Sequence, residues 1–224
     1  MRSSMLLCAT LAVAAPPAGA AVLTFDGNIC NNGVSLVACG NGQFIDQSYG
    51  DTAAINVEWR SDVLLGATQA NSVRFWTSGY DDLTNVAYGQ NNNNNATSVF
   101  FRPLQGDSVT LNSFRLGGFT SQLLPTQYSI LDGLGNLLFS SGPIQLGLNA
   151  GPSVLFTPNI TSSNGLELRW GPDSFNVGID SIDYTLSRPT GAPVPEPATW
   201  AMMILGFASI GAGMRRRRVR AAFG

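Results

Sequence analysis

Residues 166–186 read LELRWGPDSFNVGIDSIDYTL and contain two apolar-alternating runs around a turn. In the first run, Leu166, Leu168 and Trp170 alternate with Glu167 and Arg169, which is typical of a β-strand that buries one face. The glycine, proline and aspartate that follow are residues that end strands and form turns. This segment therefore predicts two strands of an antiparallel sheet.

The second run, residues 177–186, changes its alternation part of the way along. Its first apolar residues fall at odd positions up to Ile179, and the later ones fall at even positions from Ile182 onward. One extra residue near Asp180-Ser181 would return both sets to the same face of a sheet. We therefore predict a β-bulge at this dipeptide.

The rest of residues 21–188 has the same character and no long helical period. Ten runs are expected to be strands: 21–25, 54–59, 73–77, 98–102, 108–116, 127–131, 137–140, 154–157, 166–170 and 177–186. Residues 132–136 predict a hairpin connection between two of them. This spacing indicates an all-β fold, a β-sandwich or jelly roll, and about 165 residues are enough for one substantial core.

The composition excludes several kinds of catalytic site. The 224 residues contain no histidine, and all twelve basic residues are arginine. Ser-His-Asp and Cys-His catalysis, histidine-ligated metals and Schiff-base lysines are therefore excluded. Residues 21–214 hold six arginines against fourteen acidic residues, a balance of −8. This acidic balance argues against nucleic acid as a partner.

The first twenty residues are predicted to be a secretory signal peptide. Arg2 is followed by an apolar run of eleven residues at 5–15 and by Ala-Gly-Ala at 18–20, the small residues that a signal peptidase needs. The run is shorter than the ~20 residues of a transmembrane helix. Residues 21–188 are accordingly expected to be an exported β-sandwich domain.

Cys30 and Cys39 are the cysteines that remain after removal of such a signal. An oxidising compartment favours a disulfide between them. Closure of this ten-residue loop would stabilise the fold by roughly 2.5–3 kcal/mol on the loop-entropy estimate. The expected role of this bridge is structural.

The C-terminal residues predict a membrane anchor. Residues 189–197 (PTGAPVPEP) are proline-rich and are expected to form an extended linker. Residues 198–214 carry no charge and would form a transmembrane helix about 26 Å long, close to the ~30 Å of a hydrocarbon core. The tail 215–224 begins with Arg215, Arg216, Arg217 and Arg218, which would stay cytoplasmic and place the domain on the outer, periplasmic side.

Pro195-Glu196-Pro197, followed by Trp200-Ala201, an apolar span and the arginine cluster, resembles the PEP-CTERM sorting signal in its PEPxxWA form. The resemblance implies a substrate of exosortase, a multi-pass membrane cysteine transpeptidase of exopolysaccharide-producing Gram-negative bacteria. It further implies that the tail holds the protein in the inner membrane until exosortase cuts near Pro195-Glu196-Pro197. The domain would then reach the cell surface or the exterior.

Residues 166–186 are also similar to the closing strands of secreted jelly-roll modules, including passengers of PEP-CTERM tails. That similarity implies a shape like a carbohydrate-binding module. Such modules often join their first and last strands through calcium, and Asp26 and Asp180 lie in those strands here. A structural calcium ion is therefore one interpretation of the two aspartates, and solvated turn residues are the other.

Five aromatic residues are candidates for stacking on sugar rings: Trp59, Trp76, Tyr80, Tyr88 and Trp170. Burial in the sandwich core is the competing interpretation for the tryptophans. Tyr80 and Tyr88 lie in a loop-rich stretch and are expected to be the more exposed candidates.

We expect an exported, non-catalytic surface or biofilm-matrix protein with a structural or glycan-associated role. No cofactor is expected other than the calcium ion considered above. A secreted carbohydrate-active hydrolase is one alternative, and it would use paired carboxylates such as Glu58 and Glu167. Both glutamates fall in alternating strands, where an outward-facing, solvated carboxylate is the ordinary interpretation. An ice-binding module is the other alternative, because tails of this kind also carry the label ice-binding protein C-terminal domain. The regular threonine array expected of an ice-binding repeat is not visible in the sequence.

Overall fold

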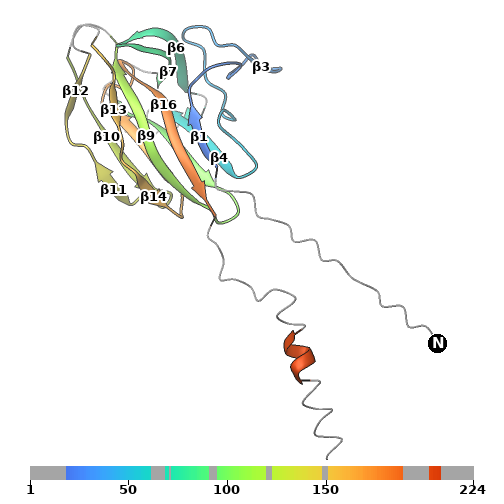
Figure 1. Ribbon diagram of the computed structural model, residues 1–224. Coiled ribbons are helices and arrows are strands. Elements are labelled where there is room, and N and C mark those ends of the chain that lie inside the picture. Colours follow the sequence, from blue (N-terminus) through green and yellow to red (C-terminus); the bar gives the residue numbers. More distant parts are fainter. Residues whose placement is uncertain are drawn as a thin grey trace, which may run out of the picture. The chain divides into compact units, whose positions relative to one another are not determined.

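The computed structural model describes residues 19–61, 69–70, 72–90, 95–119, 123–147, 151–188 and 202–207 (Figure 1). The chain divides into two units, Met1–Arg188 and Pro189–Gly224. The described part of the first unit is built from β-strands, and residues 202–207 of the second are helical. The predicted signal peptide falls almost wholly outside the described residues.

The strands of the first unit, in chain order, are β1 (Ala20–Leu23), β2 (Cys30–Asn31), β3 (Leu36–Val37), β4 (Ile55–Ser61), β5 (Gln69–Ala70), β6 (Val73–Tyr80), β7 (Leu83–Gly89), β8 (Thr97–Pro103), β9 (Ser108–Gly118), β10 (Leu124–Asp132), β11 (Leu137–Ser140), β12 (Ile144–Leu146), β13 (Val154–Phe156), β14 (Ile160–Ser162), β15 (Leu166–Gly171) and β16 (Val177–Ser187).

Within the described residues, two antiparallel sheets of seven strands each face one another. The first sheet has the order β13-β9-β16-β7-β6, with β1 also paired to β16 and β14 to β9. The second sheet has the order β11-β10-β15-β8-β4-β5, with β12 also paired to β10. Strands β2 and β3 form a small hairpin that projects from the domain (Figure 1). This arrangement agrees with the all-β sandwich expected from the sequence.

One hydrophobic core fills the space between the two sheets. Trp59 and Trp170 of the second sheet have no exposed surface, and neither has Phe114 of the first. The ring of Phe114 contacts that of Tyr128 across the interface, with centroids 4.9 Å apart. Burial of side chains of this size stabilises the fold by about 1.5–3 kcal/mol each, which makes these inward positions the main source of stability.

Two local predictions in the strands are confirmed. The register between β16 and β9 shifts between Asp180 and Asp183, and Ser181 has a φ of 52°, so the bulge lies at the predicted dipeptide. Strands β10 and β11 pair as a hairpin. The Asp132 carboxylate accepts hydrogen bonds from the backbone N–H groups of Leu134 and Asn136, which fixes the predicted turn.

Strand β7 was not predicted, although it lies inside the first sheet between β6 and β16. Val86, Ala87 and Tyr88 are buried one after another, so the strand is covered on both faces and does not alternate. Asn85 interrupts it with a φ of 60°. The other unpredicted strands are short, with two or three residues each: β2, β3, β5, β12 and β14.

On one side of the sandwich, the chain covers its own sheet edges. Residues 42–45 run along β6 and form three backbone hydrogen bonds with Val73 and Phe75, with N···O distances of 2.8–3.0 Å. The edge of β4 pairs with β5 and also forms hydrogen bonds with side chains from the preceding loop. Gln47 donates to the Trp59 carbonyl oxygen and accepts from its N–H, and Asp51 accepts from the N–H of Val57. Few backbone groups on this side are therefore free to pair with another strand.

Candidate functional site

An aromatic cluster on the outer face of the first sheet forms a small, half-open hollow of about 50 Å³. We call it the aromatic hollow, and its lining residues are Trp76, Tyr80, Tyr88, Phe119 and Phe175. Neighbouring rings meet edge-on or tilted, with centroids 5.0 Å apart for Tyr80–Phe119 and 5.6 Å apart for Tyr88–Phe175. These residues form a second cluster outside the sandwich core.

Alternation along β6 and β7 places two of these rings on the outer face. Phe75 and Ala87 are paired across the two strands and belong to the core. Their neighbours Trp76 and Tyr88 therefore point to the opposite face of the sheet. Phe119 follows β9, and Phe175 lies in the turn between β15 and β16.

Glycines in β9 and β16 make room for the Tyr80 ring. A Cβ atom at Gly178 would lie 2.8 Å from Cδ1 of Tyr80 and 2.9 Å from Cγ2 of Val86. A Cβ atom at Gly117 would lie 2.5 Å from the carbonyl oxygen of Tyr80. The floor of the hollow therefore depends on these positions having no side chain.

The hydroxyl groups of the two tyrosines are neutral at physiological pH. Burial raises the pKa of Tyr80 and of Tyr88, and the positive charge of Arg74 only partly opposes the shift at Tyr88. The Tyr80 hydroxyl donates to the carbonyl oxygen of Phe175 at 2.7 Å, which holds the turn against the hollow. Arg74 lies beside the hollow as the cross-strand neighbour of Tyr88, with its guanidinium 4.5 Å from the centre of the Phe44 ring. The partly exposed Trp76 ring near the Arg74 cation suits stacking on a ligand, and the buried, neutral tyrosine hydroxyls are not placed for acid–base chemistry.

The aromatic candidates from the sequence divide between the core and this hollow. Trp59 and Trp170 are fully buried in the core, which agrees with the interpretation of the tryptophans as core residues. The expectation that Tyr80 and Tyr88 are the more exposed candidates is wrong, since they are 2% and 4% exposed and Trp76 is only partly buried. The cause is Phe119 and Phe175, which cover the tyrosines and which sequence reasoning missed. The one signal for Phe119 was the Gly-Gly pair that precedes it at the end of a strand.

Asp26 and Asp180, the two predicted calcium ligands, lie within electrostatic range of each other. Asp26 follows the end of β1 and accepts from Asn85, whereas Asp180 lies in β16 beside the bulge. Burial raises the pKa of Asp180 to about 6; hydrogen bonds from Ser181 oppose this shift and the charge of Asp26 adds to it. Because the folded-state pKa lies above the usual value of 3.8, the stabilisation by protonated Asp180 is complete below about pH 4 and is lost as the pH rises through 6.

Within the described residues, Oδ1 of Asp180 is buried and has no hydrogen-bond partner, as would suit a metal ligand. Two carboxylates nevertheless supply fewer than the six to eight oxygens that calcium takes. The described part of the chain also holds no group of three or more Cys, Asp or Glu side chains placed to bind a metal. The calcium ion therefore stays a prediction.

Glu58 and Glu167 are the candidates for hydrolytic catalysis. Both are cross-strand neighbours of Phe100 in the second sheet, Glu58 on β4 and Glu167 on β15. Glu58 forms ion pairs with Arg60 and Arg102, and Glu167 with Arg169. Burial alone would raise the pKa of Glu58, but the two arginines outweigh it and the pKa is lowered. The Glu167 side chain is only 5% exposed, so the expectation of a solvated carboxylate is wrong there.

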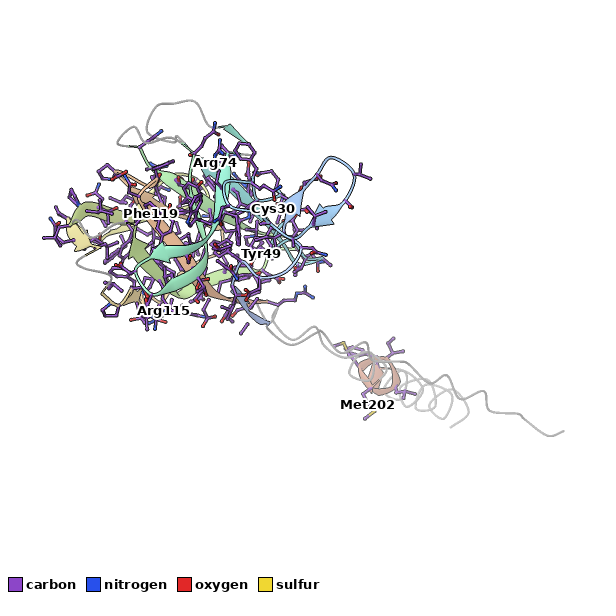
Figure 2. The ribbon with its side chains drawn as sticks, turned by 90° about the horizontal axis from the view of Figure 1, so that it is seen from above. Cys30, Tyr49, Arg74, Arg115, Phe119 and Met202 are labelled. Atoms are coloured by element: carbon purple, nitrogen blue, oxygen red, sulfur yellow. A yellow bond between two sulfur atoms is a disulfide. The ribbon has the colours of Figure 1, made fainter. Side chains whose placement is uncertain are left out.

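The predicted disulfide is confirmed. Cys30 and Cys39 are bonded, and their Cα atoms are 5.1 Å apart. Cys30 is buried at the point where the β2–β3 hairpin joins the domain (Figure 2). The bridge therefore ties the base of this hairpin to the residues that lead into the segment 42–45.

The predicted sorting residues lie outside the described residues: Pro195, Glu196, Pro197, Trp200, Ala201 and Arg215–Arg218. Of the predicted transmembrane helix, residues 202–207 are described, and they are helical and exposed. Among all described residues, none belongs to a helix with the length and apolar character needed to cross a bilayer.

A family model described as the PEP-CTERM protein-sorting motif matches residues 193–218. The match covers the Pro-Glu-Pro motif, the apolar span and the four arginines, so the resemblance found in the sequence is confirmed. No curated protein matches this chain.

Proposed function

We propose that this chain, which carries a PEP-CTERM protein-sorting motif, is exported and then sorted to the cell surface by exosortase. The observation that carries the proposal is the match at residues 193–218. A motif of this kind implies processing by exosortase and passage through a membrane-anchored state. The domain of residues 21–188 is then the part that functions outside the cell.

The proposed topology follows from the order of the C-terminal parts. The signal peptide starts export, the uncharged residues 198–214 stop in the inner membrane, and Arg215–Arg218 remain in the cytoplasm. Pro195-Glu196-Pro197 then lies just outside the lipid, on the periplasmic side. Two prolines around a carboxylate form a stiff, extended peptide that loses little entropy when an enzyme binds it.

We further propose a non-catalytic, glycan-associated role for the exported domain. The aromatic hollow supports it, because aromatic faces pack well against the apolar faces of sugar rings. Exopolysaccharide is the glycan that the sorting route makes available. The ion-paired state of Glu58 and Glu167 gives no support to the hydrolase alternative, since neither carboxylate is free to act as a base.

Replacement of Pro195, Glu196 and Pro197 by alanine is expected to abolish processing. In cells that contain exosortase, all of the variant should remain as an uncut precursor in the inner membrane, because the enzyme loses the peptide that it recognises. Membrane fractionation and the mass of the purified chain measure this outcome. Pro189→Ala, in the same linker but outside the motif, is the matched control and should be processed normally. Normal processing of the triple variant would refute the assignment.

Trp76→Ala is expected to weaken binding of the full chain to exopolysaccharide from its own cells by about tenfold, the loss that ~1.4 kcal/mol of stacking energy gives. Affinity electrophoresis in gels containing the polysaccharide measures the change. Val34→Ala is the control, since Val34 is an exposed apolar residue outside the hollow, in the turn between β2 and β3. Equal retardation of Trp76→Ala and the wild-type chain would contradict the glycan-associated role and leave the sorting proposal standing.

A further inference from the structure

Both sheets end on the same side of the sandwich in interrupted edge strands. Strands β11 and β12 follow one another along β10, and β13 and β14 follow one another along β9. Tyr128 of β10 joins the two edges, since its ring lies 5.5 Å from that of Phe139 in β11 and 4.9 Å from that of Phe156 in β13. We call the surface formed by β11, β12, β13 and β14 the open side, and Figure 1 shows it opposite the β2–β3 hairpin.

The open side exposes large apolar side chains. Leu137 is 62% exposed, Leu138 43% and Leu155 50%. Further exposed apolar residues of the same strands and their adjoining turn are Leu134, Phe139 and Val154. The whole segment 133–166 contains no charged residue. A cluster of this kind on a domain surface is typical of an interaction site.

The backbone edges of the open side are also unprotected. Within the described residues, β11 pairs with β10 alone and β13 with β9 alone. Proteins protect such edges with lysine, proline, an inward-pointing charge or very short strands. Neither β11 nor β13 contains a protecting residue, and β11, with four residues, is the longer of the two. The opposite side differs, because residues 42–45, Gln47 and Asp51 bond the edges of β6 and β4 there.

The uncharged and self-complementary edge of the open side argues for a second copy of the same chain as the occupant, although the domain as a whole is acidic. Residues 19–188 hold six arginines and thirteen acidic residues, a balance of 6 − 13 = −7, so two copies repel each other over most of their surfaces. The uncharged segment 133–166 is where this repulsion is weakest. An antiparallel edge strand is also complementary to itself about a two-fold axis, which is the symmetry of most homodimers.

We propose that the open side is a dimer interface in which β11 pairs antiparallel with β11 of a second copy. The second sheet would then continue from one molecule into the other, and backbone hydrogen bonds would form between the two edge strands. Leu137 and Leu155 would be removed from water on both copies. This proposal does not depend on the sorting route or on glycan binding.

A cysteine cross-linking experiment on the full chain in exporting cells tests this interface. Leu138→Cys places a thiol in the edge strand, and Leu104→Cys is the matched control, because Leu104 is 42% exposed against 43% for Leu138 and lies after β8, outside the open side. Oxidation is expected to give a reductant-sensitive dimer from Leu138→Cys, at least about tenfold more than from Leu104→Cys. Adding Leu137→Lys to Leu138→Cys should lower the dimer yield by about tenfold, since a buried lysine on each copy costs more than 1.4 kcal/mol.

Circular dichroism of the purified variants checks that they fold, and both substituted side chains are exposed, so folding should be retained. The proposal is overturned if Leu138→Cys cross-links no better than Leu104→Cys. It is also overturned if the dimer persists unchanged with Leu137→Lys, or if the cross-linked product contains a different protein.

Discussion

Replacement of Trp170 with alanine is expected to lower the free energy of unfolding by about 3–5 kcal/mol, the loss typical of truncating a large aromatic side chain in a core. Trp170 has no exposed surface, and its indole N–H donates to the carbonyl oxygen of Val177 at 3.0 Å. The side chain therefore fills the core and also fixes the start of β16 against β15. Urea denaturation followed by tryptophan fluorescence and circular dichroism measures the change.

Two control variants separate these contributions. Trp170→Phe keeps most of the ring volume but loses the hydrogen bond to Val177, so a smaller loss of about 1–3 kcal/mol is expected. Trp76→Ala removes a partly exposed ring outside the core and should cost less than Trp170→Ala. Equal losses for Trp76→Ala and Trp170→Ala would show that the assignment of the core is wrong.

Removal of the disulfide by the double substitution Cys30→Ala and Cys39→Ala is expected to lower the free energy of unfolding by about 2.5–3 kcal/mol. The bridge restricts the unfolded chain, and in the folded chain it holds the residues that precede the segment 42–45 on β6. Denaturant titrations with and without dithiothreitol measure the loss. The wild-type chain in dithiothreitol should behave like the double variant, and the double variant should not respond to the reductant. Unchanged stability of the reduced wild-type chain would count against a stabilising role.

The sheet framework was predictable wherever a strand buries one face and leaves the other half exposed. Strand β10 shows this pattern, because its buried residues alternate with exposed or partly buried ones. The bulge in β16 was predictable from the change in its alternation. Strand β7 was missed because Val86 and Tyr88 are buried under the aromatic hollow while Ala87 is buried in the core. Alternation disappears in a strand that is covered on both faces, so periodicity cannot reveal it.

The two candidate sites differ in how far the sequence could reveal them. The sorting signal is a linear motif that an enzyme reads as an extended peptide, so Pro195-Glu196-Pro197 could be recognised without a structure. The aromatic hollow brings Trp76 together with Phe119 and Phe175, which lie 43 and 99 positions further along the chain. Its composition depends on which loops fold over the sheet, and no local pattern carries that information. The exposure of Tyr80 and Tyr88 was misjudged for this reason.

The coverage of β6 by residues 42–45 and of β4 by Gln47 and Asp51 also limits how these molecules can polymerise. A fibril that grows by strand addition needs two free edges on every subunit, one for each neighbour. Here one side of the sandwich is already closed by the chain itself. On the open side, the proposed pairing through β11 also covers β13, so neither edge stays free and the expected product is a finite pair instead of an amyloid-like filament.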